Sequence, residues 1–175
     1  GRVVLHGVND SHLHLLGYAE SRSRVDLSNC NSPDEVLQAI RQFIQKNQVP
    51  EGEWVYGWGW NHSRFAEPEM PDRHLLDRAS RRHCLAMVRT CCHILAANTL
   101  ALEKAGIATH PPLIEGGTVE TDSHGSATGI LKEQAMQLIL NLVPPLDKEK
   151  LKNLITLACR DFVAAGFTTV QTDDL

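Results

Sequence analysis

Apolar residues recur along the chain with two different spacings, and each spacing predicts one kind of element. An apolar residue at every third or fourth position predicts a helix, whereas a short apolar run between turn residues predicts a strand. The expected helices are residues 33–44, 73–79, 98–105, 131–142 and 151–162. The expected strands are residues 3–14, 85–89, 118–121, a segment after 125, and 168–171, and residues 53–60 are expected to be a strand or an irregular edge. Helices and strands alternate, which indicates an α/β or mixed fold.

Two of these helices have clear start signals. Ser32 is a typical N-cap, Pro33 suits the first helical position, and Glu35 completes a capping box. Asn98 is a second N-cap candidate, and Gly106 suits the end of the helix that follows it.

Composition and charge narrow the class of protein. The net charge is 17 − 21 = −4, which argues against nucleic acid as the main partner, because nucleic-acid-binding domains usually carry a basic excess. No uncharged apolar run reaches the roughly 18 residues that a membrane span needs. The five cysteines are odd in number and form no C-x-x-C pair, so we expect reduced thiols and a cytoplasmic protein. Because the chain starts at Gly1 rather than methionine, we expect a processed chain or an excised piece.

The most informative motif is D-S-H-L-H at residues 10–14. Side chains on a strand alternate between faces, so His12 and His14 point the same way, about 6–7 Å apart, with Asp10 beside them. Two imidazoles in this arrangement can bind one divalent metal ion. The alternative is a chance H-x-H, since the chain holds nine histidines.

A series of motifs in the same order resembles a known family. The first segment is similar to the first strand of the amidohydrolase superfamily, G-[FV]-[IV]-D-[SA]-H-x-H. The later segments resemble amidohydrolase family 3, the branch that includes N-substituted formamide deformylase-like enzymes. The motifs are GVNDSHLHL at 7–15, WVYGWGW at 54–60, RHLLD at 73–77, the stretch 92–107, TGILKE at 128–133 and GFTTV at 166–170.

The resemblance implies a fold larger than this chain. A complete (β/α)₈ barrel takes about 250 residues, so we expect residues 1–175 to be the N-terminal part of a catalytic domain. Barrel strand 1 is expected near residues 3–14 and the next barrel strand at 166–173. A large α+β insertion, about residues 21–165, is expected to cap the active site between them.

The resemblance also implies the chemistry. It predicts a metal-dependent hydrolase of non-peptide C–N bonds, such as amide or N-formyl groups, in which one or two divalent ions, expected to be zinc, activate water. His12 and His14 are the expected metal ligands. Glu133 is expected as a metal ligand and catalytic residue, and a carbamylated Lys132 is a second possibility. The family's remaining ligands and base are missing, so we expect this chain alone to be inactive.

Three further residues are candidates for substrate contacts: His93, Asn98 and Trp60. Two of them have a structural alternative, because Asn98 can serve only as an N-cap and Trp60 can serve only in the core. For Glu133 and Lys132 the alternative is an exposed helix face. Asp173 follows the last strand, where barrel enzymes place functional groups. The expected partner is a small-molecule substrate, with no nucleic acid and no membrane, and uncovered barrel strands predict self-association.

Two other functions stay open from the sequence. The chain could be a truncated, non-catalytic α/β binding module that has lost the remaining ligands and base. It could also be a structural zinc domain that binds through histidine and cysteine, with Cys91 and Cys92 among the ligands.

Overall fold

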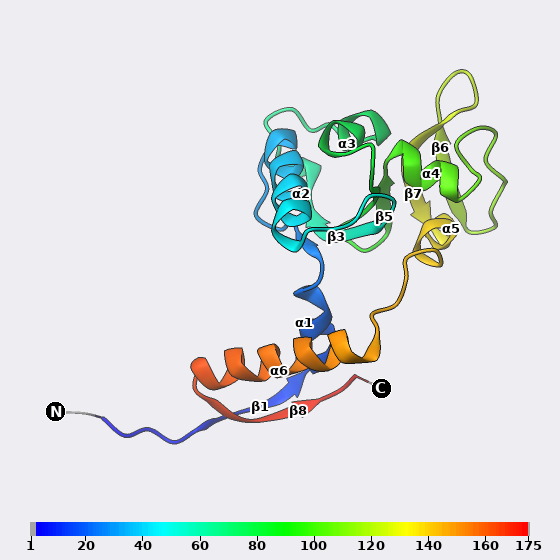
Figure 1. The fold of residues 1–175 in the computed structure, drawn as a ribbon. Coiled ribbons are helices and arrows are strands. Elements are labelled where there is room, and N and C mark those ends of the chain that lie inside the picture. Colours follow the sequence, from blue (N-terminus) through cyan, green and yellow to red (C-terminus); the bar gives the residue numbers. More distant parts are fainter. Residues whose placement is uncertain (1–2, 175) are drawn as a thin grey trace. The chain divides into compact units, whose positions relative to one another are not determined.

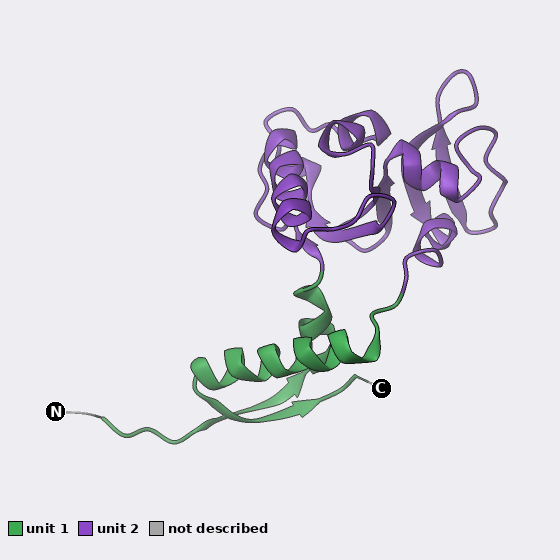
Figure 2. Ribbon diagram, in the orientation of Figure 1, with its two compact units in different colours: residues 1–23, 145–175 green, residues 24–144 purple. Residues whose placement is uncertain are grey.

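The computed structural model describes residues 3–174, which form two compact units. Unit 1 combines the two ends of the chain, residues 1–23 and 145–175, and unit 2 comprises residues 24–144 (Figure 2). Residues 1–2 and 175, which the predicted domain also includes, lie outside the described residues. The chain therefore leaves unit 1 once, builds unit 2, and returns.

Unit 2 is built on a six-stranded sheet with the order β2-β3-β4-β5-β7-β6. The strands β2, β3 and β4 run parallel, whereas β4, β5, β7 and β6 pair antiparallel. The bounds are β2 Val25–Asp26, β3 Trp54–Trp60, β4 Cys84–Arg89, β5 Ile94–Ala97, β6 Gly117–Thr121 and β7 Ala127–Glu133. The expected strand at 85–89 and the hairpin after 118 are confirmed, and the segment expected at 53–60 is a strand that begins at Trp54.

Both faces of this sheet are covered. Alternate residues of β4 show it: Leu85 and Met87 pack into one core with α2 (Pro33–Asn47) and α3 (Arg73–Ala79). Ala86 and Val88 pack into a second core with α4 (Thr99–Lys104) and α5 (Gln137–Leu140). Figure 1 shows the helices of unit 2 around its strands. No helix in residues 3–174 is long and apolar enough to cross a membrane.

The predicted helix starts are confirmed, with one shift. The Ser32 side chain accepts a hydrogen bond from Glu35 N, and the Asn98 side chain accepts one from Ala101 N. The Glu35 carboxylate, however, accepts from Asn31 N at 2.7 Å, one residue before the position that a capping box predicts. The carboxylate therefore stabilises the turn that leads into α2.

The expected helix at 131–142 is wrong in its first part. Leu131, Lys132 and Glu133 belong to β7, and a 3₁₀ turn (Gln134–Met136) and the short α5 follow. These residues form a strand rather than a helix because β7 is paired on both sides, with β5 and with β6. Gly129, at φ 100°, permits the close approach, since a Cβ there would lie 2.5 Å from Ala97 O. The helical spacing of apolar residues in 131–142 carries no information about these strand pairings.

Unit 1 is a pair of parallel strands with two helices. β1 (Val8–Leu13) pairs with β8 (Phe167–Thr172), so the expected strand at 3–14 is shorter at both ends. The helices are α1 (Leu15–Ser21) and α6 (Lys148–Ala164), and α6 runs across the strand pair (Figure 1). Tyr18 of α1 stacks against Phe162 of α6 with ring centroids 5.0 Å apart.

Candidate metal centre

His12 and His14 lie together where β1 ends. His12 is inside the strand and His14 directly follows it, at the N-cap of α1. Their ring centroids are 5.3 Å apart, and the rings are nearly perpendicular, at 87°. The side chains are 70% and 60% exposed, so both imidazoles are open to a ligand. The predicted convergence of the two rings is present.

Two carboxylates come to the same place from the other strand. Because β1 and β8 run parallel, their C-terminal ends meet at one edge. Asp173 Oδ2 lies 3.9 Å from His12 Nδ1, and Asp174 Oδ1 lies 3.8 Å from His14 Nδ1. These distances are too long for a direct hydrogen bond, but each carboxylate places a negative charge close to one imidazole ring.

Asp10 and Asp174 have roles that the sequence pattern did not indicate. Asp10 Oδ1 accepts a hydrogen bond from His12 N at 3.1 Å, so this carboxylate stabilises the local backbone. The Asp174 carboxylate accepts hydrogen bonds from Leu16 N and from the Thr172 hydroxyl. The pKa of its carboxyl is lowered, first because Leu16 N–H donates to it and then because the Thr172 hydroxyl does. The signal for Asp174 was its position just past a strand, which also drew attention to Asp173.

The donors at this edge fit a divalent metal ion in kind but do not complete a site by themselves. Two imidazoles backed by carboxylates are ligands that zinc, iron and manganese accept. Within residues 3–174, however, no group of three His, Cys, Asp or Glu side chains is close enough to hold a metal. The structure therefore presents a two-histidine half-site.

Glu133 belongs to unit 2 and is paired there with His93. Its Oε2 lies 2.9 Å from His93 Nδ1, and this hydrogen bond is the main cause that raises the pKa of the imidazole. The backbone joins the same two residues, because Glu133 N donates to His93 O at 3.0 Å. Both side chains are more than half exposed. The idea that Glu133 lies on a helix face is wrong, since it ends β7.

The backbone at this pair is strained. Glu133 has φ 52° and ψ −129°, and Cys92, next to His93, has φ 63°. Non-glycine residues adopt positive φ rarely and at a cost, and such residues cluster at functional sites. Lys132 is engaged elsewhere, at 2.5 Å from Glu120 Oε1. Roles in metal binding or catalysis stay predictions for both Glu133 and Lys132.

Asn98 and Trp60 are fully buried. The Asn98 amide oxygen accepts from Leu85 N and Ala101 N, and its nitrogen donates to two backbone carbonyls. The Trp60 indole N–H donates to Met87 O at 2.9 Å. Neither side chain has a polar atom left for a substrate, so this geometry favours the structural alternative for both. Their substrate contacts stay predictions.

The imidazole pair at the end of β1 offers two ligands of a kind that divalent metals accept, and comparisons with known proteins give the family. The model of the amidohydrolase family (Amidohydro_3) matches residues 1–175. The chain belongs to this family, as its ordered motifs predicted.

Individual relatives agree. The putative amidohydrolase YtcJ of Bacillus subtilis is 37% identical over 175 residues, which cover all of this chain and 33% of that protein. The N-substituted formamide deformylase of Arthrobacter pascens is 32% identical, over 97% of this chain and 32% of that protein. The chain thus spans about a third of the length of these relatives.

Solved structures share the fold. An uncharacterized metal-dependent hydrolase from Pyrococcus furiosus matches with a TM-score of 0.63 at 22% identity, over 95% of this chain and 31% of that chain. A metal-dependent hydrolase from Pyrococcus horikoshii gives the same TM-score, 0.63, at 24% identity, over 95% of this chain and 30% of that chain.

Proposed function

We propose that this chain is the N-terminal part of a metal-dependent hydrolase that acts on non-peptide C–N bonds, with His12 and His14 as ligands of a divalent metal, zinc being the ion we expect. The observation that carries the proposal is the exposed imidazole pair, 5.3 Å apart at the end of β1, in a chain that matches the amidohydrolase family throughout. A complete enzyme needs further ligands, since catalytic zinc sites use about three protein ligands and one open position.

Each residue at this edge has a defined task in the proposal. A divalent cation, when bound, supplies Lewis-acid activation of the scissile bond and of water. His12 and His14 hold it through imidazole nitrogen. Asp173 adds negative charge 3.9 Å from His12 Nδ1, and Asp174 lies 3.8 Å from His14 Nδ1 without a direct hydrogen bond to it.

We include Glu133 as a catalytic carboxylate and metal ligand of the complete enzyme, with His93 as a substrate contact. Their exposure, their 2.9 Å hydrogen bond and the strained backbone at Glu133 support this assignment. The substrate class rests on relatives, one of which is named for N-substituted formamide deformylation. Amide and N-formyl compounds are therefore the first substrates to test on the complete protein.

We further propose that β1 and β8 are neighbouring strands of a (β/α)₈ barrel, with the insertion of about residues 21–165 between them. Support comes from their parallel pairing and from the third of the relatives' length that the chain covers. The exposed residues Val8 and Val163, at 50% and 71%, are apolar surface that further strands and helices would cover. Left uncovered, such surface favours self-association.

A cytoplasmic location is part of the proposal. All five cysteines are free in the structure, two of them buried, which suits a reducing compartment. We expect a small-molecule substrate and neither nucleic acid nor membrane as a partner.

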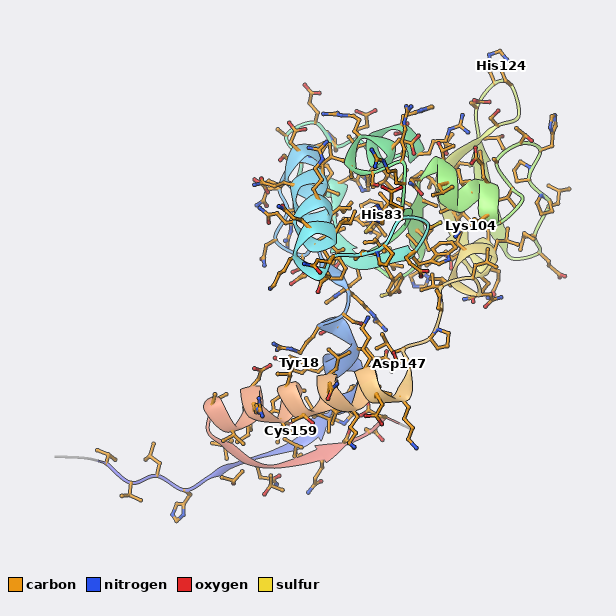
Figure 3. The ribbon with its side chains drawn as sticks, viewed as in Figure 1. Tyr18, His83, Lys104, His124, Asp147 and Cys159 are labelled. Atoms are coloured by element: carbon orange, nitrogen blue, oxygen red, sulfur yellow. The ribbon has the colours of Figure 1, made fainter. Side chains whose placement is uncertain are left out.

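The test is metal binding by the purified chain. We expect zinc, measured by plasma mass spectrometry after dialysis and by calorimetric titration, to bind the wild type and to be lost in H12A/H14A. The matched control is H74A/H124A, which removes two exposed histidines of unit 2; Figure 3 labels His124 on its loop. Equal binding by wild type and H12A/H14A would overturn the assignment. No binding by either would favour the non-catalytic binding module.

A further inference from the structure

Helix α1 carries His14 at its start, yet it has no cap of its own. His14 occupies the N-cap position and makes no side-chain capping hydrogen bond. The first N–H groups of a helix have no partner within the helix and need acceptors from elsewhere. In α6 a local residue supplies the acceptor, because Asp147 Oδ1 accepts from Lys150 N at 2.8 Å. The sequence at residues 10–14 offers α1 no equivalent.

The missing acceptors come from the end of β8, more than 150 residues away in the sequence. Thr172 Oγ1 accepts from Leu15 N at 3.1 Å, and Asp174 Oδ2 accepts from Leu16 N at 2.7 Å. The Thr172 hydroxyl in turn donates to the Asp174 carboxylate. The two side chains therefore form one connected cap on α1.

The same segment also fixes the backbone between the two histidines. Asp173 N donates to Leu13 O at 2.9 Å, and Leu13 pairs with Thr172 in the strand register. Leu13 is the residue between His12 and His14. The turn from β1 into α1 is thus held on both sides of His14, by the strand pair before it and by the cap after it.

We propose that Thr172 and Asp174 are positioning residues for the histidine pair: by capping α1 from β8 they hold His14 in the orientation that binds metal. The inference rests on the proposed function, because it presumes that His12 and His14 are metal ligands. Holding a ligand in place before binding reduces the conformational entropy lost on binding. Loss of an outer partner of a histidine ligand typically lowers metal affinity by about 10–100-fold.

The experiment compares T172V, D174A and D174N with the wild-type chain. T172V removes the acceptor but keeps a β-branched side chain in the strand. D174A removes the carboxylate, and D174N keeps an oxygen that can accept from Leu16 N. The matched control is D147A, which removes a cap of the same chemistry from α6 of unit 1; Figure 3 labels Asp147 at the start of that helix.

Two readouts are measured on each variant. Titration with Co²⁺ and Zn²⁺ gives the affinity, and the visible absorption of Co²⁺ reports the ligand geometry. Hydrogen exchange of the Leu15 and Leu16 amides, followed by NMR without metal, reports the cap itself and shows whether unit 1 has folded.

We expect faster exchange of these amides and at least a tenfold weaker metal affinity in T172V and D174A, with affinity close to wild type in D174N and D147A. A second outcome is that the Leu15 and Leu16 amides of T172V and D174A exchange faster while metal affinity and the Co²⁺ spectrum stay as in the wild type. This outcome would overturn the positioning role of Thr172 and Asp174 but not the proposed function. If D174N is as impaired as D174A, the carboxylate acts through its charge and the cap inference is wrong. If the wild type binds neither metal, the proposed function fails, whatever the amides show.

Discussion

The two units of this chain differ in how many apolar side chains each one buries. Unit 2 buries both faces of its sheet, and its strands and helices supply almost all of the buried apolar side chains. In the described part of unit 1 the buried hydrophobic residues are Ala19 and Ala158. Yet unit 1 carries the histidine pair.

The difference shows that the packing that stabilises the chain lies in unit 2, whereas the proposed metal ligands His12 and His14 lie in unit 1. Unit 2 has the composition and packing of a self-sufficient domain, with alternate residues of β4 in two cores. Unit 1 presents open strand edges and exposed imidazoles, which suits a piece of a larger catalytic domain. The following predictions test this contrast.

The largest effect is expected from a cavity in unit 2. Leu85→Ala removes a fully buried side chain of β4 and should lower the free energy of unfolding by about 2–5 kcal/mol. Val163→Ala on α6, where the side chain is 71% exposed, should change it by no more than about 0.5 kcal/mol. Urea unfolding is followed by tryptophan fluorescence for unit 2, because Trp54, Trp58 and Trp60 all belong to it, and by far-UV circular dichroism, which also reports helix α6 of unit 1. Similar losses of unfolding free energy in the two variants would contradict the proposed difference between the units.

Asn98→Ala should be nearly as damaging. The substitution removes the cap of α4 and leaves Leu85 N and two backbone carbonyls without partners in a buried place. We expect a loss of about 3 kcal/mol in the same unfolding assay. Asn98→Asp is the companion variant: it keeps the accepting oxygen but places a second oxygen against the carbonyls of Ser80 and His83 in a buried place, so it should also be destabilised. A variant as stable as wild type would contradict the structural role of Asn98.

A smaller, pH-dependent effect is expected at His93 and Glu133. Since the Glu133 hydrogen bond raises the pKa of His93, the pair stabilises the folded chain most below the ordinary histidine pKa of about 6.5. That contribution is lost as the pH rises through the raised value. In E133Q, NMR titration of the metal-free chain should show the His93 pKa falling back toward its ordinary value. An unchanged pKa in E133Q would show that the pair does not form in solution.

The smallest effect is expected for Cys91 and Cys92. Cys91 is partly exposed and Cys92 is exposed, so C91S/C92S should change the free energy of unfolding by no more than about 0.5 kcal/mol. Zinc content should also stay the same. Unfolding of the variant, or loss of its zinc, would instead support a structural zinc domain that uses cysteine.

The sequence predicted those elements whose signals are local. Pro33–Asn47 carries its own N-cap and an apolar stripe, and Trp54–Trp60 is a run of strand formers. Both elements need no knowledge of distant residues, and both are present in the structure. Strand alternation predicted that His12 and His14 lie together, but His14 follows β1 at the N-cap of α1, which Thr172 and Asp174 cap from β8.

The sequence did not predict elements that depend on distant partners. Helix α1 was missed because its cap comes from Thr172 and Asp174. Strand β5 has four residues and is defined by its pairing with β4 and β7. The His93–Glu133 pair joins two strand ends 40 residues apart, so no local pattern indicates it.

The most direct test of the central claim is zinc K-edge X-ray absorption on the zinc-loaded chain. The account predicts two imidazole nitrogens at about 2.0–2.1 Å, with the rest of the shell made of oxygen, and loss of the imidazole signal in H12A/H14A. Sulfur ligands at about 2.3 Å, or a spectrum unchanged by H12A/H14A, would contradict the assignment of the metal to the end of β1.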